Sequence, residues 1–313
     1  SSSWTKPSFA SFFTGLYPST HNTVHKLDRL PNKVKTLAEI LSEGGYLTSG
    51  FPNNPNISST FNFQQGFHTY RYLKPNLPLW APESGVHLVG YRIIRVLFER
   101  YIKEGDQPRS YYWPAEDVNK EVFPWLKANA RNQFFLMIHY MDPHDPYFFR
   151  PLNNKSFARI RNPSPRPSLA NRLAVAYAQE VKYLDKNLAK LFDFLKQNNL
   201  YENTMILLIS DHGEEFFEHN GWWHGTSLYE EQIHVPMIIK FRKGKNKGRI
   251  YNEVVQLLDI PPTVLDEVGL PRSEKMQGRS LAGTALEAAA SEGALSELNL
   301  EGQVMSSYRE NRW

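Results

Sequence analysis

The sequence predicts an α/β fold with a mostly parallel, doubly wound sheet flanked by helices. Apolar segments suited to strands alternate with segments of helical periodicity, which is the pattern of a parallel sheet with helices on its faces. The candidate strands also run from apolar residues into polar ones at their carboxyl ends, where such sheets bind ligands. We expect a single domain over residues 1–313, although this length would also allow two ordinary domains.

The amino-terminal part predicts two helices and a strand. Residues 8–14 end at Gly15, a residue type that commonly terminates helices. Apolar residues at helical spacing within 34–41 predict a second helix, and the segment YLTSGF that follows is a short strand candidate. Residues 51–70 are rich in Asn, Pro, Ser and aromatic residues, which indicates a long, packed loop.

The central part predicts a helix at residues 91–105, a loop at 105–118 and then a strand. This strand lies in QFFLMIHYMDPHDPY, whose continuous apolar start is typical of a strand buried on both faces. Apolar residues between Leu173 and Leu195 then recur at steps of four and three, which is the most regular helical pattern in the chain.

The carboxyl-terminal part predicts two strands and a helix. The strand candidates lie in TMILLISDHGEE and VPMIIKF, and the helix begins at the Pro261-Pro262 pair. We find no internal repeat, coiled coil or low-complexity segment.

Composition excludes several classes of protein. A hydrophobic content of 41% with 22% charged residues is ordinary for a globular protein, and no run approaches the ~18 apolar residues of a membrane-spanning helix. The absence of cysteine excludes disulfides, thiolate nucleophiles and cysteine metal sites. The net charge of +4 is mild, and we expect no nucleic-acid partner. We interpret both ends as cut, which leaves localisation and oligomeric state open.

One segment, residues 146–172, departs from this average. It contains five prolines and six basic residues but no acidic residue. We interpret it as a basic, Pro-rich insertion on the solvated surface. The alternative is an anion-attracting lip beside an active site.

Two predicted strands end in histidine and aspartate. His144 follows the first of these strands, and Asp211 and His212 follow the second. Once the strand has ended, both Asp211 and His212 can turn toward one cation. A carboxylate with an imidazole suits Zn²⁺ or Mn²⁺, and further carboxylates would also suit Mg²⁺ or Ca²⁺. Further along, His224 precedes Gly225, and a glycine there lets the backbone approach a bound oxyanion.

Five segments that together cover nearly the whole chain carry a family resemblance. In order they are TKPSFASFFTGLYPSTH, FFLMIHYMDPHDPY, ISDHGEEFFEH, WWHGTSLYEEQIHVPMIIKF and DIPPTVLDEVG. Their order and spacing resemble the sulfatase family within the alkaline phosphatase superfamily. The resemblance implies an alkaline phosphatase-like fold and the hydrolysis or transfer of sulfate or phosphate esters.

The resemblance implies a nucleophile ten residues before the glycine of the TG pair, at Thr5. In sulfatases this position is a Cys or Ser that becomes formylglycine, which Thr cannot, and the arginine of that motif is replaced by Phe9. The Gly-Lys-Trp-His segment of the family is replaced by GFPNNPN. These departures resemble the phosphodiesterase, phosphoglycerol transferase and phosphonate hydrolase branches, in which an unmodified Thr is both nucleophile and metal ligand.

Roles for further residues follow from the same resemblance. Thr5, Asp211 and His212 are expected to bind a divalent metal (Mn, Zn, Ca or Mg), because a free Thr hydroxyl is too weak an acid to attack at neutral pH. His144 and His224 are expected near the substrate's non-bridging oxygens or its leaving group. His224 stands where sulfatases usually carry a lysine. Asn54 is a further candidate for hydrogen bonding a phosphoryl oxygen.

Purely structural roles remain open for several of these residues. Thr5 would also suit a helix N-cap, and Asp211, His212 and His144 would suit turns. His139, inside an apolar run, is interpreted as a core histidine. The family supplies one or two further aspartates from a strand that precedes the nucleophile, and this chain begins after that point. We therefore expect an incomplete metal shell, and we expect residues 1–313 alone to be inactive even if the full-length protein is an enzyme.

The sequence thus predicts a metal-dependent hydrolase or transferase with a covalent Thr5 intermediate. Phosphodiesters or phosphonate esters are the preferred substrates, in the form of an anionic small molecule, a lipid headgroup or a glycan ester. One alternative is a sulfuric ester hydrolase, as the family name implies. The other is an inactive module that keeps the fold to bind an anionic glycan or lipid headgroup.

Overall fold

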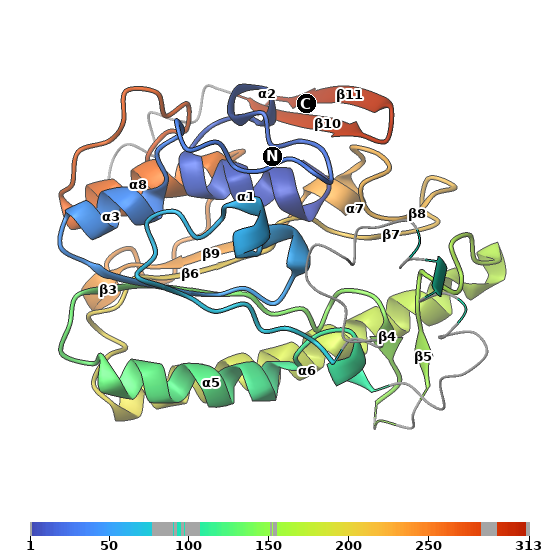
Figure 1. Ribbon diagram of the computed structural model, residues 1–313, viewed down its shortest axis with the longest axis horizontal. Coiled ribbons are helices and arrows are strands. Elements are labelled where there is room, and N and C mark those ends of the chain that lie inside the picture. The colour runs from blue at the N-terminus through green and yellow to red at the C-terminus, as the bar shows by residue number, and fades with distance from the viewer. Residues whose placement is uncertain are drawn as a thin grey trace.

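The computed structural model describes residues 2–76, 107–150, 155–282 and 293–310, with a few isolated positions between these ranges. A central layer of strands lies between two layers of helices (Figure 1). The predicted helix at 91–105 lies outside the described residues apart from isolated positions. Within the described ranges, no helix has the length and apolar character that crossing a membrane requires.

The central layer contains parallel strands and an antiparallel pair. The parallel strands, in the spatial order β2-β1-β3, are β1 (Leu47–Phe51), β2 (Thr69–Tyr70) and β3 (Phe134–Ile138). The antiparallel pair is β6 (Ile206–Ile209) with β9 (Met237–Lys240). The predicted strands are therefore present, and β9 runs opposite to β6.

The side chains of β3 and β6 alternate between two hydrophobic cores. Phe135 and Leu207 pack against an upper core, whereas Phe134 and Ile206 pack against a lower one. Because successive side chains of a strand point to opposite faces, both strands separate the same two cores and lie in one layer. Their carboxyl ends carry the polar residues that the sequence singles out.

The upper helices are α1 (Thr5–Thr14), α3 (Leu37–Glu43) and α8 (Ile260–Val268), and the short helix α2 (Pro18–His21) follows α1. Every residue of α1 is buried. The helix ends at Gly15, which adopts a left-handed conformation with φ 69°, as the sequence predicts. Helix α1 thus lies fixed between the sheet and its neighbours, with its amino terminus directed toward the strand ends.

The lower helices are α5 (Ala115–Ala128) and α6 (Ala170–Gln197). They bury apolar residues against the sheet, and Phe123 of α5 stacks on Phe194 of α6 with ring centroids 4.4 Å apart. The predicted loop at 105–118 is wrong at its end, because α5 begins at Ala115. The buried residues of α5 recur at helical spacing, but Pro124 inside the helix interrupts the apolar periodicity by which a helix is predicted from sequence.

Short ribbons lie beyond the strand ends, and a hairpin closes the chain. The ribbons are antiparallel pairs, β4 (Tyr147–Phe148) with β5 (Ser156–Phe157) and β7 (Glu215–Phe216) with β8 (Trp222–Trp223), followed by α7 (Glu230–Ile233). The hairpin is β10 (Ala294–Leu300) with β11 (Gln303–Arg309). Single 3₁₀ turns include η1 (Pro55–Ile57), η2 (Ser59–Phe61), η5 (Pro108–Ser110), η6 (Pro167–Leu169), η7 (Arg242–Gly244) and η8 (Leu257–Asp259).

The basic segment, residues 146–172, is partly built into the fold. Tyr147 and Phe148 at its start are fully buried. Arg150 donates two hydrogen bonds to Glu180 of α6, at 2.7 and 3.1 Å, and its guanidinium lies 3.4 Å from the centre of the Tyr183 ring. The segment is thus held against α6 by a buried ion pair, next to the strand ends.

Replacement of Gly15 by alanine is expected to loosen α1. A side chain at φ 69° costs about 1 kcal/mol, and the new Cβ would lie 3.0 Å from Cγ of Met276. Urea denaturation should therefore show a larger loss for Gly15→Ala than for Gly269→Ala. Gly269 ends α8 with φ 71° but has open space around its Cβ position. Equal losses would contradict the role of the Met276 contact.

Candidate active site

Thr5 is the first residue of α1 and is almost fully buried, with 3% of its surface exposed. Trp4 occupies the N-cap position, so the alternative of Thr5 as the helix cap does not match the structure. The Thr5 side chain instead lies with its Oγ1 atom 3.4 Å from Nε2 of His212, across a sequence separation of 207 residues. The helix amino terminus beside it also favours negative charge at this point.

Asp211 and His212 follow β6, where the strand gives way to a turn. Nδ1 of His212 lies 2.8 Å from the carbonyl oxygen of Gly213, which can only accept a hydrogen bond, so Nδ1 carries the proton. Nε2 is then left with a lone pair. Oδ2 of Asp211 lies 3.5 Å from that same Nε2. Three electron donors, from Thr5, His212 and Asp211, therefore converge on one region.

This convergence suits a divalent cation. Two ligands of a tetrahedral ion at about 2.1 Å are separated by roughly 3.4 Å, which matches the spacing of the donors around His212. An imidazole nitrogen, a carboxylate and a hydroxyl oxygen are also suitable ligand types. Among the described residues, however, no group of three or more His, Asp or Glu side chains is arranged to hold a metal. The fit therefore rests on these three donors alone.

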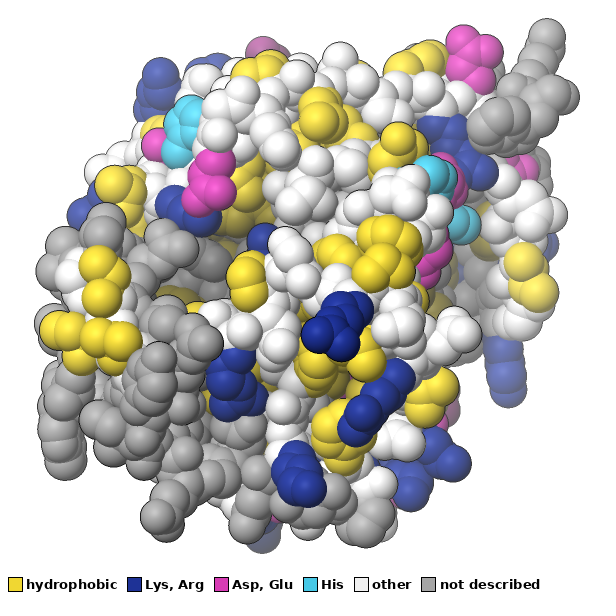
Figure 2. Space-filling model, turned by 90° about the vertical axis from the view of Figure 1, so that its right-hand side faces the viewer, with side chains coloured by type: hydrophobic (Ala, Val, Ile, Leu, Met, Phe, Trp, Pro, Cys, Tyr) yellow, Lys and Arg dark blue, Asp and Glu magenta, His cyan; other side chains and the backbone are white. Residues whose placement is uncertain are grey.

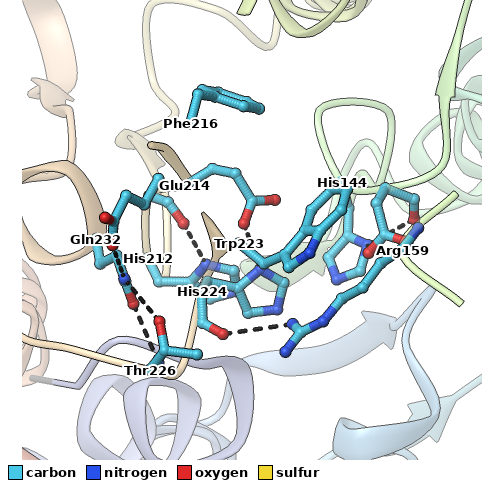
Figure 3. A network of polar contacts seen from close by, with 12 residues as sticks. His144, Arg159, His212, Glu214, Phe216, Trp223, His224, Thr226 and Gln232 are labelled. Atoms are coloured by element: carbon cyan, nitrogen blue, oxygen red, sulfur yellow. Dashed lines mark hydrogen bonds and ion pairs between the residues drawn. The ribbon is translucent and has the colours of Figure 1, made fainter. Parts of the chain in front are cut away.

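Two further imidazoles complete what we call the histidine cluster, His144, His212 and His224. The rings of His212 and His224 stack with centroids 4.1 Å apart (Figure 3). The centroid of the His144 ring lies 5.0 Å from that of His224. Nδ1 of His144 donates to the carbonyl oxygen of Asp145 at 2.7 Å, and Nδ1 of His224 faces Glu214 at 3.0 Å. As in His212, the Nε2 atoms are left for an external partner.

Glu214 and Tyr147 hold His224 in place from behind. Oε1 of Glu214 accepts from Nδ1 of His224, and Oε2 accepts from the Tyr147 hydroxyl at 2.5 Å. The Tyr147 ring packs against Trp223, next to His224 in the chain. Gly225, with φ 73°, brings the following backbone close to Trp4, where an added Cβ would lie 3.3 Å from Cβ of Trp4. The loop that carries His224 is therefore packed directly against the start of α1.

Burial and repulsion from neighbouring groups disfavour a positive charge on His224. Burial lowers the pKa of His224 well below 6.5, and His212 and His144 lower it further. Burial also lowers the pKa of His139 to about 4. For Asp211, burial raises the pKa but His212 and His139 outweigh this effect, so its pKa lies below the ordinary value. The site thus combines an ionised carboxylate at Asp211 with a neutral imidazole at His224.

Asn54 and His139 lie outside the histidine cluster. Asn54 caps η1 through its Oδ1 atom, which accepts from the Asn56 backbone at 2.9 Å, and its Nδ2 atom faces Met141. No contact in the described structure joins Asn54 to the histidine cluster. His139 packs edge-on against Phe9 in the core, as expected, but it also lies within electrostatic range of Asp211.

Sequence analysis missed three residues of this site. Glu214 directly follows the Asp211-His212-Gly213 turn, so its position was a usable signal. Arg159 reaches the backbone of His224 from the basic segment, for which an anion-attracting lip is one of the two interpretations above. Tyr147 had no signal in a single sequence, because its partner Glu214 lies 67 residues away.

Comparison with known proteins identifies the family. The sulfatase family model matches residues 1–270, and the chain belongs to this family. An endo-4-O-sulfatase from Bacteroides thetaiotaomicron is 24% identical over 95% of the chain. The chain spans 65% of the length of that relative.

Solved structures show the same fold at low identity. A phosphonate monoester hydrolase of Agrobacterium radiobacter gives a TM-score of 0.72 at 16% identity, over 98% of this chain and 76% of that one. A protein in complex with its substrate D-glucosamine-2-N,6-O-disulfate gives a TM-score of 0.66 at 16% identity, over 99% of this chain and 78% of that one. The predicted alkaline phosphatase-like α/β fold is thereby confirmed.

Removal of the Tyr147 hydroxyl is expected to destabilise the fold at this site. Tyr147→Phe keeps the ring packing but leaves a buried carboxylate oxygen of Glu214 without its donor, at a cost of about 1.5–3 kcal/mol. Urea denaturation measures this loss. Tyr177→Phe is the matched control, because the Tyr177 ring contacts Tyr147 while its hydroxyl has no hydrogen bond among the described residues. Equal stability of the two variants would show that the Tyr147–Glu214 bond contributes nothing.

Proposed function

We propose that the full-length protein hydrolyses phosphonate, phosphate or sulfate esters through a covalent intermediate on Thr5. The observation that carries the proposal is the convergence of the Thr5 hydroxyl and the Asp211 carboxylate on Nε2 of His212. A buried hydroxyl next to an imidazole lone pair is a group whose proton has an acceptor. Membership of the sulfatase family supports the reaction class.

Thr5 performs the first step. Its Oγ1 atom attacks the phosphorus or sulfur, a new bond forms from that atom, and the bond to the leaving oxygen breaks. A divalent cation held by Thr5, Asp211 and His212 would lower the pKa of the hydroxyl and screen the charge on the transferred group. The amino terminus of α1 favours the same negative charge through its free backbone N–H groups.

The remaining histidines act on the oxygens of the transferred group. His144 and His224 leave their Nε2 atoms toward the site, because Asp145 and Glu214 occupy their Nδ1 atoms. The proton of the Thr5 hydroxyl passes to Nε2 of one of these two histidines, which then donates it to the leaving oxygen. Water next attacks the Thr5 ester, and a proton from that water restores the Thr5 hydroxyl. Burial of Thr5 and the tight packing of the His224 loop limit access of other water molecules.

The preference for phosphonate esters or phosphodiesters rests on the nucleophile. Thr5 cannot become formylglycine, and Phe9 takes the place of the arginine that accompanies that modification. Structural likeness to a phosphonate monoester hydrolase supports this preference. The sulfatase alternative is supported by the endo-4-O-sulfatase relative and by the disulfated glucosamine in a structural neighbour, which also favours a sugar ester as substrate.

An inactive anion-binding module is the remaining alternative. It would keep the fold and the histidine cluster without chemistry. The hydroxyl, carboxylate and imidazoles that chemistry requires are all present and lie in mutual contact, which favours an enzyme.

Replacement of Thr5 by alanine is expected to lower kcat/KM for aryl phosphonates and aryl sulfates by at least about 1000-fold, because no other hydroxyl replaces it as nucleophile. Thr5→Ser, which keeps the hydroxyl, should retain measurable activity. Thr20→Ala, at an exposed position of α2, serves as the matched control. Full activity of the Thr5→Ala variant would eliminate the covalent mechanism.

Loss of the Asp211 charge is expected to remove the metal. Asp211→Asn should reduce the bound metal of the purified protein to less than about a tenth, measured by elemental analysis. Asp185→Asn makes the same change at an exposed position of α6 and should leave the metal content unchanged. Equal metal content in both variants would show that Asp211 is not a ligand.

A further inference from the structure

Arg159 extends from the basic segment into the histidine cluster. Its backbone N–H donates to Oδ2 of Asp145 at 3.2 Å, and the neighbouring Ala158 is fully buried, so the chain is fixed at this point. Figure 3 shows the side chain passing His144 toward the backbone of His224. There Nη1 lies 3.4 Å from the carbonyl oxygen of His224.

Three other cations of the segment are already engaged with protein groups. Arg150 is paired with Glu180, and Arg161 donates to Ser156 and to the Tyr111 hydroxyl. Arg172 lies over the ring of Phe149. Arg159 differs, because no Asp or Glu of the described residues forms an ion pair with its guanidinium, and its long bond to a carbonyl uses one of five N–H donors. A half-buried guanidinium with unused donors is a ready partner for an anion.

The surroundings of Arg159 reinforce this preference. No acidic residue occurs between positions 146 and 172. On the side of the molecule that carries β4 and β5, Lys and Arg side chains are spread over the surface with few Asp or Glu among them (Figure 2). The nearby carboxylate of Glu214 is occupied by His224 and Tyr147. Oδ2 of Asp145 accepts from the backbone N–H of Arg159, so neither carboxylate forms an ion pair with the guanidinium, which stays available to an incoming anion.

We propose that Arg159 binds a second anionic group of the substrate, a carboxylate or sulfate separate from the ester that is cleaved. This inference rests on the proposed function. The order of contacts supports it, since Thr5 contacts His212, His212 stacks on His224, and Arg159 reaches the far backbone of His224. The guanidinium therefore lies beyond His212 and His224 from the reacting hydroxyl, where a neighbouring group of the substrate would lie. Arg159 is in this account a residue of substrate specificity.

Two esters that differ by one distant charge test the proposal. The probes are 4-nitrophenyl phenylphosphonate and its analogue with a carboxylate at the meta position of the phenyl ring. The measured quantity is the ratio of kcat/KM for the carboxylate ester to that for the plain ester. We expect Arg159→Ala to lower this ratio about tenfold or more, the effect of one charge-assisted hydrogen bond. Arg159→Lys should give an intermediate ratio.

Arg166→Ala is the matched control, because Arg166 belongs to the same segment but is exposed and has no contact with the histidine cluster in the described structure. Its ratio should stay within about twofold of wild type. The proposal is overturned if Arg159→Ala keeps the wild-type ratio, if it lowers both kcat/KM values equally, or if Arg166→Ala lowers the ratio as much. Circular dichroism confirms that each variant is folded.

Calorimetric binding of the same two esters to wild type and to Arg159→Ala separates this proposal from the proposed function. Absence of turnover of both esters by the wild-type protein contradicts the proposed function alone. Tighter binding of the carboxylate ester that is lost in Arg159→Ala still supports the specificity role. Identical affinities of the two esters for wild type overturn it.

Discussion

The contact between the Thr5 hydroxyl and Nε2 of His212 is the interaction on which the site depends. It joins the first turn of α1 to the end of β6, and neither element can shift without breaking it. The surrounding elements hold these two atoms in place. Helix α1 is buried along its whole length against the upper core, and β6 lies between both cores, so two rigid elements fix the two atoms.

The three rings of the histidine cluster are held in the same way. Each imidazole of the histidine cluster has its Nδ1 atom bound to a carbonyl or carboxylate oxygen, which fixes the ring and leaves Nε2 toward the site. For His224 this support continues into the buried Tyr147 and, through the neighbouring Phe148 backbone and Glu180, to α6. The lower helices therefore contribute to the site without supplying a reacting group.

Sequence analysis predicted the fold and the elements that carry the site, because strand ends and a glycine-terminated helix leave local patterns. Helix α5 was not predicted, because Pro124 interrupts the apolar periodicity of its sequence. Thr5, Asp211, His212, His144 and His224 lie close together in the structure, but their roles stay predictions from family motifs, as does that of Asn54, whose Oδ1 atom caps η1. Tyr147 and Arg159 could not be predicted as site residues, because their positions depend on how the basic segment folds against α6 and not on any local pattern.

The central claim is that Thr5 itself is the reacting group, and mass spectrometry of acid-quenched protein tests it most directly. During turnover of a slow aryl phosphonate or aryl sulfate, the peptide that contains Thr5 should gain the mass of one transferred group, and fragmentation should locate the gain on Thr5. The account is contradicted if turnover proceeds while this peptide stays unmodified, or if the added mass lies on another residue.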